Sequence, residues 1–325
     1  MQAPTVKNQM NLKKQSWALV GPGAVGLYYG GLLAANGCEL HVLARSDAAT
    51  LKAQGITISH VKPQTGELLN ETAVRPESVM TDTAKSCSVD IVLIAAKSTV
   101  NEQLVEPLRE LVEPGRTIIL TLQNGMGNAE FYAKHFPDNP TLSGLCFVCV
   151  NRVAPGVVEN YHPGRVEIGS LGDRWPDHAK QVVAAFEASG VTTRFAQSLD
   201  AALWRKLCWN VPFNGLSIAG GGITCDQILA DARLRERAHR LMLEVRAIAR
   251  RFGHDLEDSF LDGQFSVTEK MGAYQPSSLI DYLENRPVEV DAIWGEPLRR
   301  GLAKGVDLPE MEALHREIKQ CVADR

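Results

Sequence analysis

One cation and two amides recur at intervals of four residues in a largely apolar stretch of the sequence, as Lys206, Asn210 and Asn214. In a helix, this spacing places the three side chains along one stripe. A buried ammonium without a partner costs several kcal/mol, so a protein carboxylate or a ligand must then satisfy Lys206. The alternative is an amphipathic helix whose lysine lies in water. The residues alone favour neither interpretation.

A glycine-rich turn is the second candidate site, and its residues are Gly21, Pro22, Gly23, Ala24, Val25 and Gly26. They fit the pattern G-x-G-x-x-G, between an apolar run at 17–20 and a helix-like segment that ends at Gly37, and a second strand is predicted at 39–43. In such a βαβ unit the first glycine permits the turn, the second leaves the backbone open to a pyrophosphate, and the third lets the helix pack on the strand. The helix N-terminus offers free N–H groups to the phosphates. The turn therefore predicts a dinucleotide site.

The residue that follows the second strand indicates which dinucleotide binds. Arg45 lies about 20 residues beyond Gly26, where an NAD-binding protein usually has an acidic residue on the ribose 2′-hydroxyl. A guanidinium can instead form charge-assisted hydrogen bonds to a 2′-phosphate, worth about 1.5–3 kcal/mol each. The sequence thus favours NADP(H), and the alternative is a solvated loop arginine.

Two further polar residues follow predicted buried strands. Residues 90–96 form an almost wholly apolar run, typical of a central parallel strand, and Lys97 comes directly after it. Residues 117–121 predict another buried strand, whose carboxyl end leads to Asn124. Ligands in doubly wound sheets bind beyond the carboxyl ends of the strands, so both side chains are placed to meet cofactor or substrate. For Asn124 the alternative is a simple Asn-Gly turn.

A second polar set lies nearer the end of the chain and includes Ser277, Ser278 and Glu289. Glu289 falls between apolar neighbours, with Ile293 four residues later, which predicts a partly buried carboxylate that faces a cleft. Alternatively, it is a surface carboxylate near a helix start, where an acid is favoured.

Composition excludes several classes of function. The 325 residues carry a formal net charge of -4, which argues against a general nucleic-acid binder. No apolar run approaches the ~20 residues of a membrane span, and the N-terminus lacks the apolar core of a secretory signal. The seven cysteines are scattered through apolar segments, and Cys146 and Cys149 are expected to pack in a strand rather than to bind zinc. The eight histidines show no metal-binding spacing, so no metal site is predicted.

The order of the predicted elements divides the chain into two domains. Residues 17–197 alternate strands and helices, as in a Rossmann-type doubly wound α/β sheet, whereas residues 198–325 are predicted to be helical. Residues 1–16 are predicted to be a disordered extension.

Several elements are specified more closely. We expect a hairpin or loop-rich excursion after residue 56, and three strands that form a meander at the sheet edge, at 142–150, 156–159 and 165–168. Ser198 is the expected N-cap of the helix that carries the polar stripe. Pro212 lies inside that stripe and predicts a kink or a local break.

Taken together, these motifs resemble the ketopantoate reductase (2-dehydropantoate 2-reductase) family, from about Trp17 to the C-terminal helix. The resemblance is carried by Gly21 to Gly26, Arg45, Lys97, Asn124, Lys206 in Leu-Trp-Arg-Lys-Leu, Asn210, Asn214, Ser277, and Arg286-Pro-Val-Glu289. It implies an N-terminal Rossmann domain and an all-helical C-terminal domain like that of 6-phosphogluconate dehydrogenase. It also implies a cleft in which NADPH reduces the ketone of 2-dehydropantoate to the hydroxyl of pantoate, in pantothenate biosynthesis.

The resemblance also implies a role for each site residue. Lys206 and Glu289 are the implied catalytic residues; Lys206 is the general acid that protonates the forming alkoxide, and a nearby carboxylate would keep this lysine charged. The implied substrate contacts are Glu289, Asn210, Asn214 and Ser277, with Ser278 as the alternative to Ser277. The implied cofactor contacts are the glycine turn, Arg45, Lys97 and Asn124. Val288 stands where family members often have threonine, a departure that bears on the identity of the substrate.

Two other functions stay open at this point. The protein reduces a different branched 2-oxo acid with NADPH, or it is a non-catalytic NADP(H)-sensing protein. Lys206 and Glu289 argue against the sensor, because a sensor need not retain a proton donor across the cleft. For either enzyme the expected partner is a small 2-oxo acid, a homodimer is one candidate assembly, and the cytoplasm is the expected location.

Overall fold

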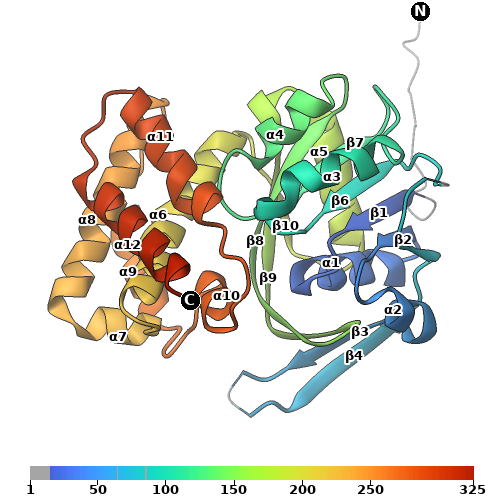
Figure 1. The fold of residues 1–325 in the computed structure, drawn as a ribbon, viewed down its shortest axis with the longest axis horizontal. Helices are drawn as coiled ribbons and strands as arrows, with labels where there is room; N and C mark the ends of the chain where they lie inside the picture. The colour runs from blue at the N-terminus through green and yellow to red at the C-terminus, as the bar shows by residue number, and fades with distance from the viewer. Residues whose placement is uncertain (1–14, 64, 85) are drawn as a thin grey trace, which may run out of the picture.

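In the computed structural model, which describes residues 15–63, 65–84 and 86–325, a mixed sheet forms one half of the molecule and packed helices form the other (Figure 1). Within the described residues the sheet has ten strands, in the order β4-β3-β9-β8-β7-β6-β1-β2-β5, with β10 beside β9. The strands are β1 (Ser16–Val20), β2 (Glu39–Leu43), β3 (Ile56–Val61), β4 (Leu68–Val74), β5 (Ser78–Met80), β6 (Ile91–Ile94), β7 (Ile118–Thr121), β8 (Thr141–Ala154), β9 (Val157–Ser170) and β10 (Thr193–Phe195). The predicted fold class is confirmed.

The parallel part of the sheet creates a ligand-binding edge. β1 pairs in parallel with both β2 and β6, and β6 pairs in parallel with β7. The chain leaves β1 toward one side and returns to β6 on the other, so the loops after β1 and β6 diverge at the carboxyl ends of these strands. The glycine turn, Arg45, Lys97 and Asn124 follow β1, β2, β6 and β7, so all four lie at this edge.

Helices cover both faces of the central strands, whose alternate residues point to opposite faces. Leu19 and Leu93 belong to the core that includes α1 and α5, whereas Val20 and Ile94 belong to the core that includes α3 and α4. The helical elements of this half are α1 (Ala24–Ala35), α2 (Ala48–Gln54), η2 (Ser98–Val100), α3 (Asn101–Arg109), α4 (Asn128–His135), η3 (Leu171–Asp173) and α5 (Pro176–Ala188). The sequence analysis does not predict α2, α4 or β5, because such short elements carry little periodic signal.

The region predicted to be a meander of three strands contains two long strands, β8 and β9. They pair antiparallel with each other, β8 pairs in parallel with β7, and β9 pairs in parallel with β3. The prediction of three strands at the sheet edge is therefore wrong, because β8 and β9 lie inside the sheet and the predicted hairpin, β3–β4, forms that edge. Pro163 and Gly164 interrupt the apolar pattern, but a shift in register between Phe147 and Cys149 accommodates them within the β8–β9 pair.

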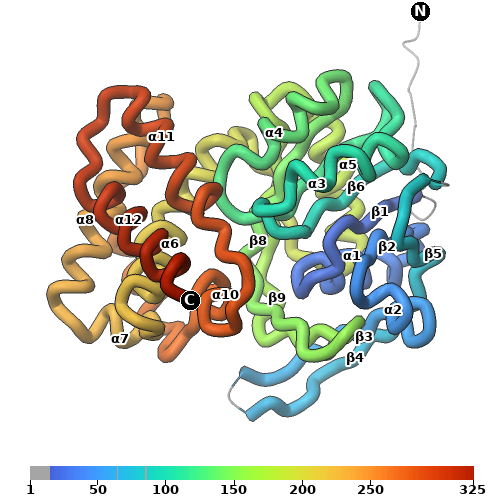
Figure 2. The backbone as a smooth tube through the Cα atoms, viewed as in Figure 1, coloured from blue at the N-terminus to red at the C-terminus, as the bar shows by residue number. Residues whose placement is uncertain are grey.

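The helical half is built around α6. Its elements are α6 (Leu199–Ala219), α7 (Cys225–Ala230), α8 (Ala232–Arg251), α9 (Asp258–Glu269), α10 (Ser277–Leu283), the π-helical turn η4 (Asp291–Gly295), α11 (Glu296–Ala303) and α12 (Pro309–Ala323). α6 packs against α8, α10 and α12. The chain ends beside α10, where Arg325 donates a hydrogen bond to the carbonyl of Tyr282 at 2.9 Å (Figure 2).

The helix that carries Lys206 is continuous. Ser198 is its N-cap, as predicted, and accepts a hydrogen bond from the N–H of Ala201. The break predicted at Pro212 is wrong, because α6 runs through this residue to Ala219. Proline removes one helical hydrogen bond at a cost of about 3 kcal/mol. The segment 211–218 is buried along its whole length, and this packing outweighs the loss.

The described chain starts inside the sheet half. Gln15 is buried and Ser16 begins β1, so the prediction of a disordered extension over 1–16 is wrong for these two residues; residues 1–14 lie outside the described part. Residues 196–198 separate β10 from α6, and the predicted domain boundary falls among them. No helix in the described ranges is long and apolar enough to cross a membrane.

Candidate active site

Lys206 lies inside the junction between the two halves. The residue is 9% exposed, and its Nζ donates a hydrogen bond to Oδ1 of Asn124 at 2.9 Å. Asn124 follows β7 in the sheet half, so this bond joins the two halves. The interpretation of Lys206 as a buried cation that needs a partner is confirmed, and the alternative with this lysine in water is wrong.

Burial controls the acidity of Lys206. Burial lowers the pKa of Lys206 from its ordinary value, and the charge of Glu289 opposes this shift without cancelling it. Cys146 would also raise this pKa, but only as a thiolate, and burial raises the pKa of the Cys146 thiol to about 11. The charge of Glu289 thus favours the protonated form of Lys206, as expected, but burial has the larger effect on this pKa. Its ammonium is a stronger acid than that of a lysine in water.

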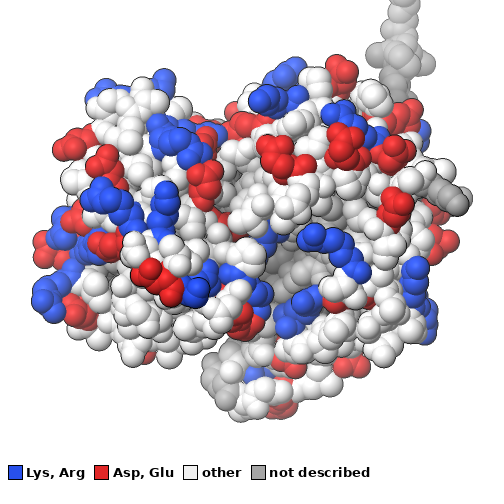
Figure 3. Space-filling view, viewed as in Figure 1, with Lys and Arg blue, Asp and Glu red and all other residues white. Residues whose placement is uncertain are grey.

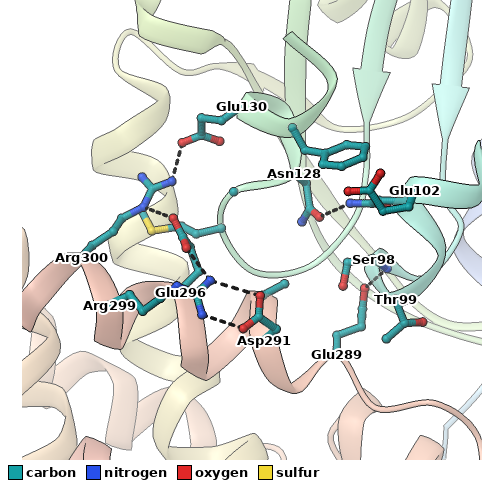
Figure 4. A pocket seen from close by; sticks show the side chains of 15 residues that line it. Ser98, Thr99, Glu102, Asn128, Glu130, Glu289, Asp291, Glu296, Arg299 and Arg300 are labelled. Atoms are coloured by element: carbon teal, nitrogen blue, oxygen red, sulfur yellow. Dashed lines mark hydrogen bonds and ion pairs between the residues drawn. The ribbon is translucent and has the colours of Figure 1, made fainter. Parts of the chain in front are cut away.

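Glu289 is buried at the same junction and is 4% exposed. Its Oε1 accepts a hydrogen bond from the backbone N–H of Ser98 at 2.9 Å (Figure 4). Its Oε2 lies 3.7 Å from Nζ of Lys97, which makes Lys97 its ion-pair partner. The predicted cleft-facing carboxylate is confirmed, and the surface alternative is wrong. Glu289 acts on Lys206 through space rather than by direct contact.

Asp281 belongs to the site although the sequence analysis assigns it no role. It is 5% exposed, one of its oxygens contacts Nζ of Lys97, and the other accepts a hydrogen bond from Nε of Arg286 at 3.0 Å. Lys97 therefore bridges two carboxylates of the helical half, Asp281 and Glu289. A signal for Asp281 was present in the sequence, because this acidic residue lies between two apolar residues and one helical turn after Ser277.

The two amides of the α6 stripe are both buried. Asn214 is 2% exposed, and its Oδ1 accepts a hydrogen bond from the backbone N–H of Ser278 at 3.2 Å. Asn210 is 8% exposed, and no partner within the described residues is assigned to its side chain. An amide with unused donors and acceptors is available to a ligand. Ser278 is buried, whereas Ser277, the first residue of α10, is exposed.

A buried amide network holds the loops that carry Lys97 and Asn124. Nε2 of Gln123 donates to the carbonyl of Ala96 at 2.9 Å and to Oδ1 of Asn101 at 2.7 Å. Nδ2 of Asn101 donates to Asn128 at 3.1 Å, and Nδ2 of Asn128 donates to the carbonyl of Asn124 at 2.9 Å. The sequence analysis does not foresee these contacts. They fix the two loops relative to each other, because each buried amide is satisfied by the next one.

A cavity of about 350 Å³ lies between α3 and α4 on one side and η4 and α11 on the other (Figure 4). Arg300 crosses beside it and pairs with Glu130 at 2.6 Å and with Glu296 at 2.7 Å. Glu289 is among its lining residues, but Lys206 and Asn210 are not. The cavity therefore adjoins the Lys206 site at Glu289, and the Arg300–Glu130 ion pair beside it connects the two halves.

The glycine turn has the geometry that a dinucleotide requires. A Cβ at Gly21, whose φ is +89°, would overlap the backbone of Ala96, and a Cβ at Gly26 would lie 2.5 Å from the carbonyl oxygen of Gly21. A Cβ at Gly23 would meet nothing within 4 Å, so the space in front of this residue is open. Gly23 is the N-cap of α1, and no side chain caps that helix. Its first N–H groups are available to phosphate oxygens.

Arg45 lies beside this turn, after β2. It is exposed, and no hydrogen bond or ion pair to its guanidinium is assigned within the described residues. Asp47, two residues later, is paired with Arg152. The cation beside the nucleotide edge is thus exposed, whereas the nearby acid already forms an ion pair.

The face between the two halves is hollowed, and lysine and arginine side chains gather around the hollow (Figure 3). An anionic ligand suits such a surface. In the described part of the chain, no group of three or more His, Cys, Asp and Glu side chains is placed to hold a metal ion.

A Rossmann-type sheet and a helical half that meet at a buried lysine define an oxidoreductase of the kind that acts on CH–OH groups with a nicotinamide cofactor. The family model described as "Ketopantoate reductase PanE/ApbA" matches residues 17–173, and that described as "Ketopantoate reductase PanE/ApbA C terminal" matches residues 198–322. The chain belongs to the ketopantoate reductase family, and the resemblance found in the sequence is confirmed.

Named relatives cover almost the whole chain. A 2-dehydropantoate 2-reductase from Nostoc sp. is 33% identical over 313 residues, which are 95% of each chain. The crystal structure of 2-dehydropantoate 2-reductase from Geobacter metallireducens is 34% identical, with a TM-score of 0.87 over 94% of this chain and 99% of that one. That from Methylococcus capsulatus is 32% identical, with a TM-score of 0.86 over 95% and 97%.

Proposed function

We propose that this protein reduces 2-dehydropantoate to pantoate with NADPH, as a step of pantothenate biosynthesis. The observation that carries the proposal is the buried Lys206, held by Asn124 at the junction of a dinucleotide-binding sheet and a helical half. The names of the relatives from Nostoc sp. and Geobacter metallireducens support the same substrate.

Lys206 acts as the general acid. When bound, NADPH would supply the hydride for this reduction, and the negative charge would then develop on the ketone oxygen. Nζ of Lys206 gives a proton to that oxygen, so that an alcohol forms, and the amine later regains a proton from water. The burial that lowers the pKa of Lys206 makes this transfer easier, and Asn124 orients Nζ.

The other polar residues bind and orient. The proposed substrate contacts are Asn210, Asn214 and Ser277. The charge of Glu289 raises the pKa of Lys206, and the backbone N–H of Ser98 holds the Glu289 carboxylate in place. Lys97 and Asn124 lie between the nucleotide edge and the helical half, so they act on both the cofactor side and the substrate side of the junction.

Arg45 supports the preference for NADP(H). Its guanidinium is exposed beside the glycine turn and has no assigned partner among the described residues. One or two charge-assisted hydrogen bonds to a 2′-phosphate would give about 1.5–3 kcal/mol each, or roughly a tenfold to hundredfold gain in affinity per bond.

The test is the loss of NADPH absorbance with 2-dehydropantoate. We expect turnover with NADPH and weaker turnover with NADH. In Arg45→Ala the KM for NADPH should rise tenfold to a hundredfold, which is about the effect of losing one charge-assisted hydrogen bond to the 2′-phosphate. Arg174→Ala, an exposed arginine after η3, is the control. An intact protein that oxidises no NADPH with this substrate would overturn the proposal.

A second candidate is the reduction of a different branched 2-oxo acid. D-mandelate dehydrogenase, whose ternary structure holds NADH and anilino(oxo)acetate, shares this fold at 22% identity with a TM-score of 0.85. Val288 stands where family members often have threonine, a departure that concerns the substrate rather than the reaction. A panel of 2-oxo acids ranked by kcat/KM separates the two enzymes. If Lys206→Ala left the cellular function intact, the NADP(H)-sensing alternative would replace both.

Assembly and location are part of the same proposal. A structure of ketopantoate reductase from Staphylococcus aureus is described as dimeric, and it shares this fold at 19% identity. We expect a cytoplasmic homodimer with a small-molecule substrate, and light scattering on the purified protein checks the assembly.

A further inference from the structure

Arg165 is a partly buried cation that forms no ion pair with the described residues. It lies on β9 opposite Phe147 of β8, and its Cζ is 4.1 Å from the centre of the Phe147 ring. Its Nε is buried and has no hydrogen-bond partner in the described part of the chain. A cation over an aromatic face is attracted by the ring, but the ring accepts none of the in-plane hydrogen bonds that a guanidinium can donate.

The Phe147 ring also lies near Lys206. Nζ of Lys206 is 5.7 Å from the centre of the same ring, so two cations share one aromatic side chain. Phe147 packs against a small core that includes Leu199 and Ala202 of α6. Arg165 therefore belongs to the face of the sheet that meets α6, next to the proposed proton donor.

The other arginines of the junction differ from Arg165. Arg286 pairs with Asp281 and Arg300 pairs with Glu130 and Glu296, so protein carboxylates already satisfy them. For Arg165 no ion pair is assigned within the described residues. An anion that bound near both cations would be favoured, because Lys206 donates to a neutral amide oxygen and Arg165 has no ion pair of its own among the described residues.

We propose that Arg165 binds the carboxylate of the oxo-acid substrate and so selects 2-oxo acids over neutral ketones. This inference rests on the proposed function. In a 2-oxo acid the carboxylate is attached to the carbonyl carbon, so the group that anchors the carboxylate must lie close to the group that protonates the ketone. Cζ of Arg165 and Nζ of Lys206 lie 4.1 and 5.7 Å from the centre of the same Phe147 ring, so the two cations are no more than about 10 Å apart. The planar guanidinium suits two-point binding of a carboxylate.

The test compares Arg165→Met and Arg165→Lys with the intact protein. Methionine keeps an apolar contact with Phe147 and removes the charge, whereas lysine keeps the charge and removes the planar fork. We expect Arg165→Met to raise the KM for the oxo acid about tenfold to a hundredfold, with little change in kcat. Arg165→Lys should recover part of the loss. The dissociation constant for NADPH should stay within about twofold in both variants.

Arg174→Met is the matched control, because Arg174 also lies over an aromatic ring, that of Trp175 at 5.6 Å, but on the exposed surface. Its KM for the oxo acid should not change. Thermal unfolding of each variant shows that it is folded. A KM for the oxo acid within twofold of the intact value in folded Arg165→Met, or an equal loss of NADPH binding, would overturn the inference.

The two proposals fail in different ways. If the intact protein turns over a different branched 2-oxo acid, the same variants are compared with that acid, and a raised KM supports Arg165 while the substrate assignment changes. If the intact protein turns over no 2-oxo acid, the proposed function is wrong and the inference about Arg165 falls with it.

Discussion

Two lysines reach the junction from opposite halves, and their surroundings differ. Lys206 comes from α6, is 9% exposed and donates to a neutral amide oxygen. Lys97 comes from the loop after β6, its side chain is 37% exposed, and it contacts two buried carboxylates. A buried cation on a neutral partner is placed to give up its proton, whereas a cation between two carboxylates stabilises the contact between the halves. Identical side chains thus support different tasks.

The strongest test of this comparison is Lys206→Ala. Loss of a general acid typically lowers the rate by about 10²–10⁴-fold, so we expect kcat for 2-dehydropantoate to fall by that factor. The measurement is steady-state NADPH oxidation by the folded variant. Lys270→Ala, an exposed lysine that ends α9, is the control and should behave as the intact protein. A Lys206→Ala variant with more than a third of the intact kcat would break the comparison.

Lys97→Met should affect stability more than chemistry. Asp281 and Glu289 lose a cationic partner, and we expect the free energy of unfolding to fall by about 1–3 kcal/mol, less than for a fully buried pair because Lys97 is partly exposed. We expect kcat to fall less than in Lys206→Ala. Urea unfolding and steady-state kinetics measure the two effects.

The control for this variant is Lys62→Met, which removes an exposed ion pair with Glu67 at 2.7 Å. Exposed pairs contribute about 0–1 kcal/mol, so its unfolding should change little. If Lys97→Met lost as much kcat as Lys206→Ala, the division of tasks between the two lysines would be wrong.

Asn101→Ala tests whether the buried amide network positions Asn124, the partner of Lys206. It removes partners of Gln123, Asn128 and Tyr132, and leaving buried polar groups unpaired costs about 1–3 kcal/mol. Because the network holds Asn124, we also expect kcat to fall about tenfold, less than the roughly hundredfold cost of a 1 Å misplacement.

Asn139→Ala is the matched control for this network. Asn139 is also buried and donates to the carbonyls of Glu113 and Thr117 at 2.8 Å each, away from the junction. It should lose stability and keep its kcat. Equal losses of kcat in the two variants would show that the network acts only on folding.

The smallest expected effect is a change in pH dependence. Lys206 must be protonated to act, so kcat is full at low pH and falls as the pH rises through the pKa of Lys206. Burial lowers this pKa below 10.5 and the charge of Glu289 raises it in part. Glu289→Gln should therefore move the fall in kcat to lower pH. A midpoint that stays or moves to higher pH would contradict the role of Glu289.

Sequence reasoning performed best where neighbours in the chain determine the structure. The glycine turn, the cap at Ser198 and the stripe of Lys206, Asn210 and Asn214 all follow from local spacing. It failed where packing outweighs local preference. Pro212 does not break α6, because the surrounding helices bury that segment, and β8 and β9 stay continuous past Pro163 and Gly164.

The sequence by itself determined the fold class and the kinds of chemical group at the site, because backbone preferences and periodic apolar faces act over a few residues. Only the tertiary structure decided which partner each charge has. Lys206 meets Asn124 across 82 positions and Lys97 meets Asp281 across 184, and no local pattern encodes such distant pairs. Since a charge is tuned by whatever lies within a few ångströms, the acidity of Lys206 was settled by the folding of the two halves against each other.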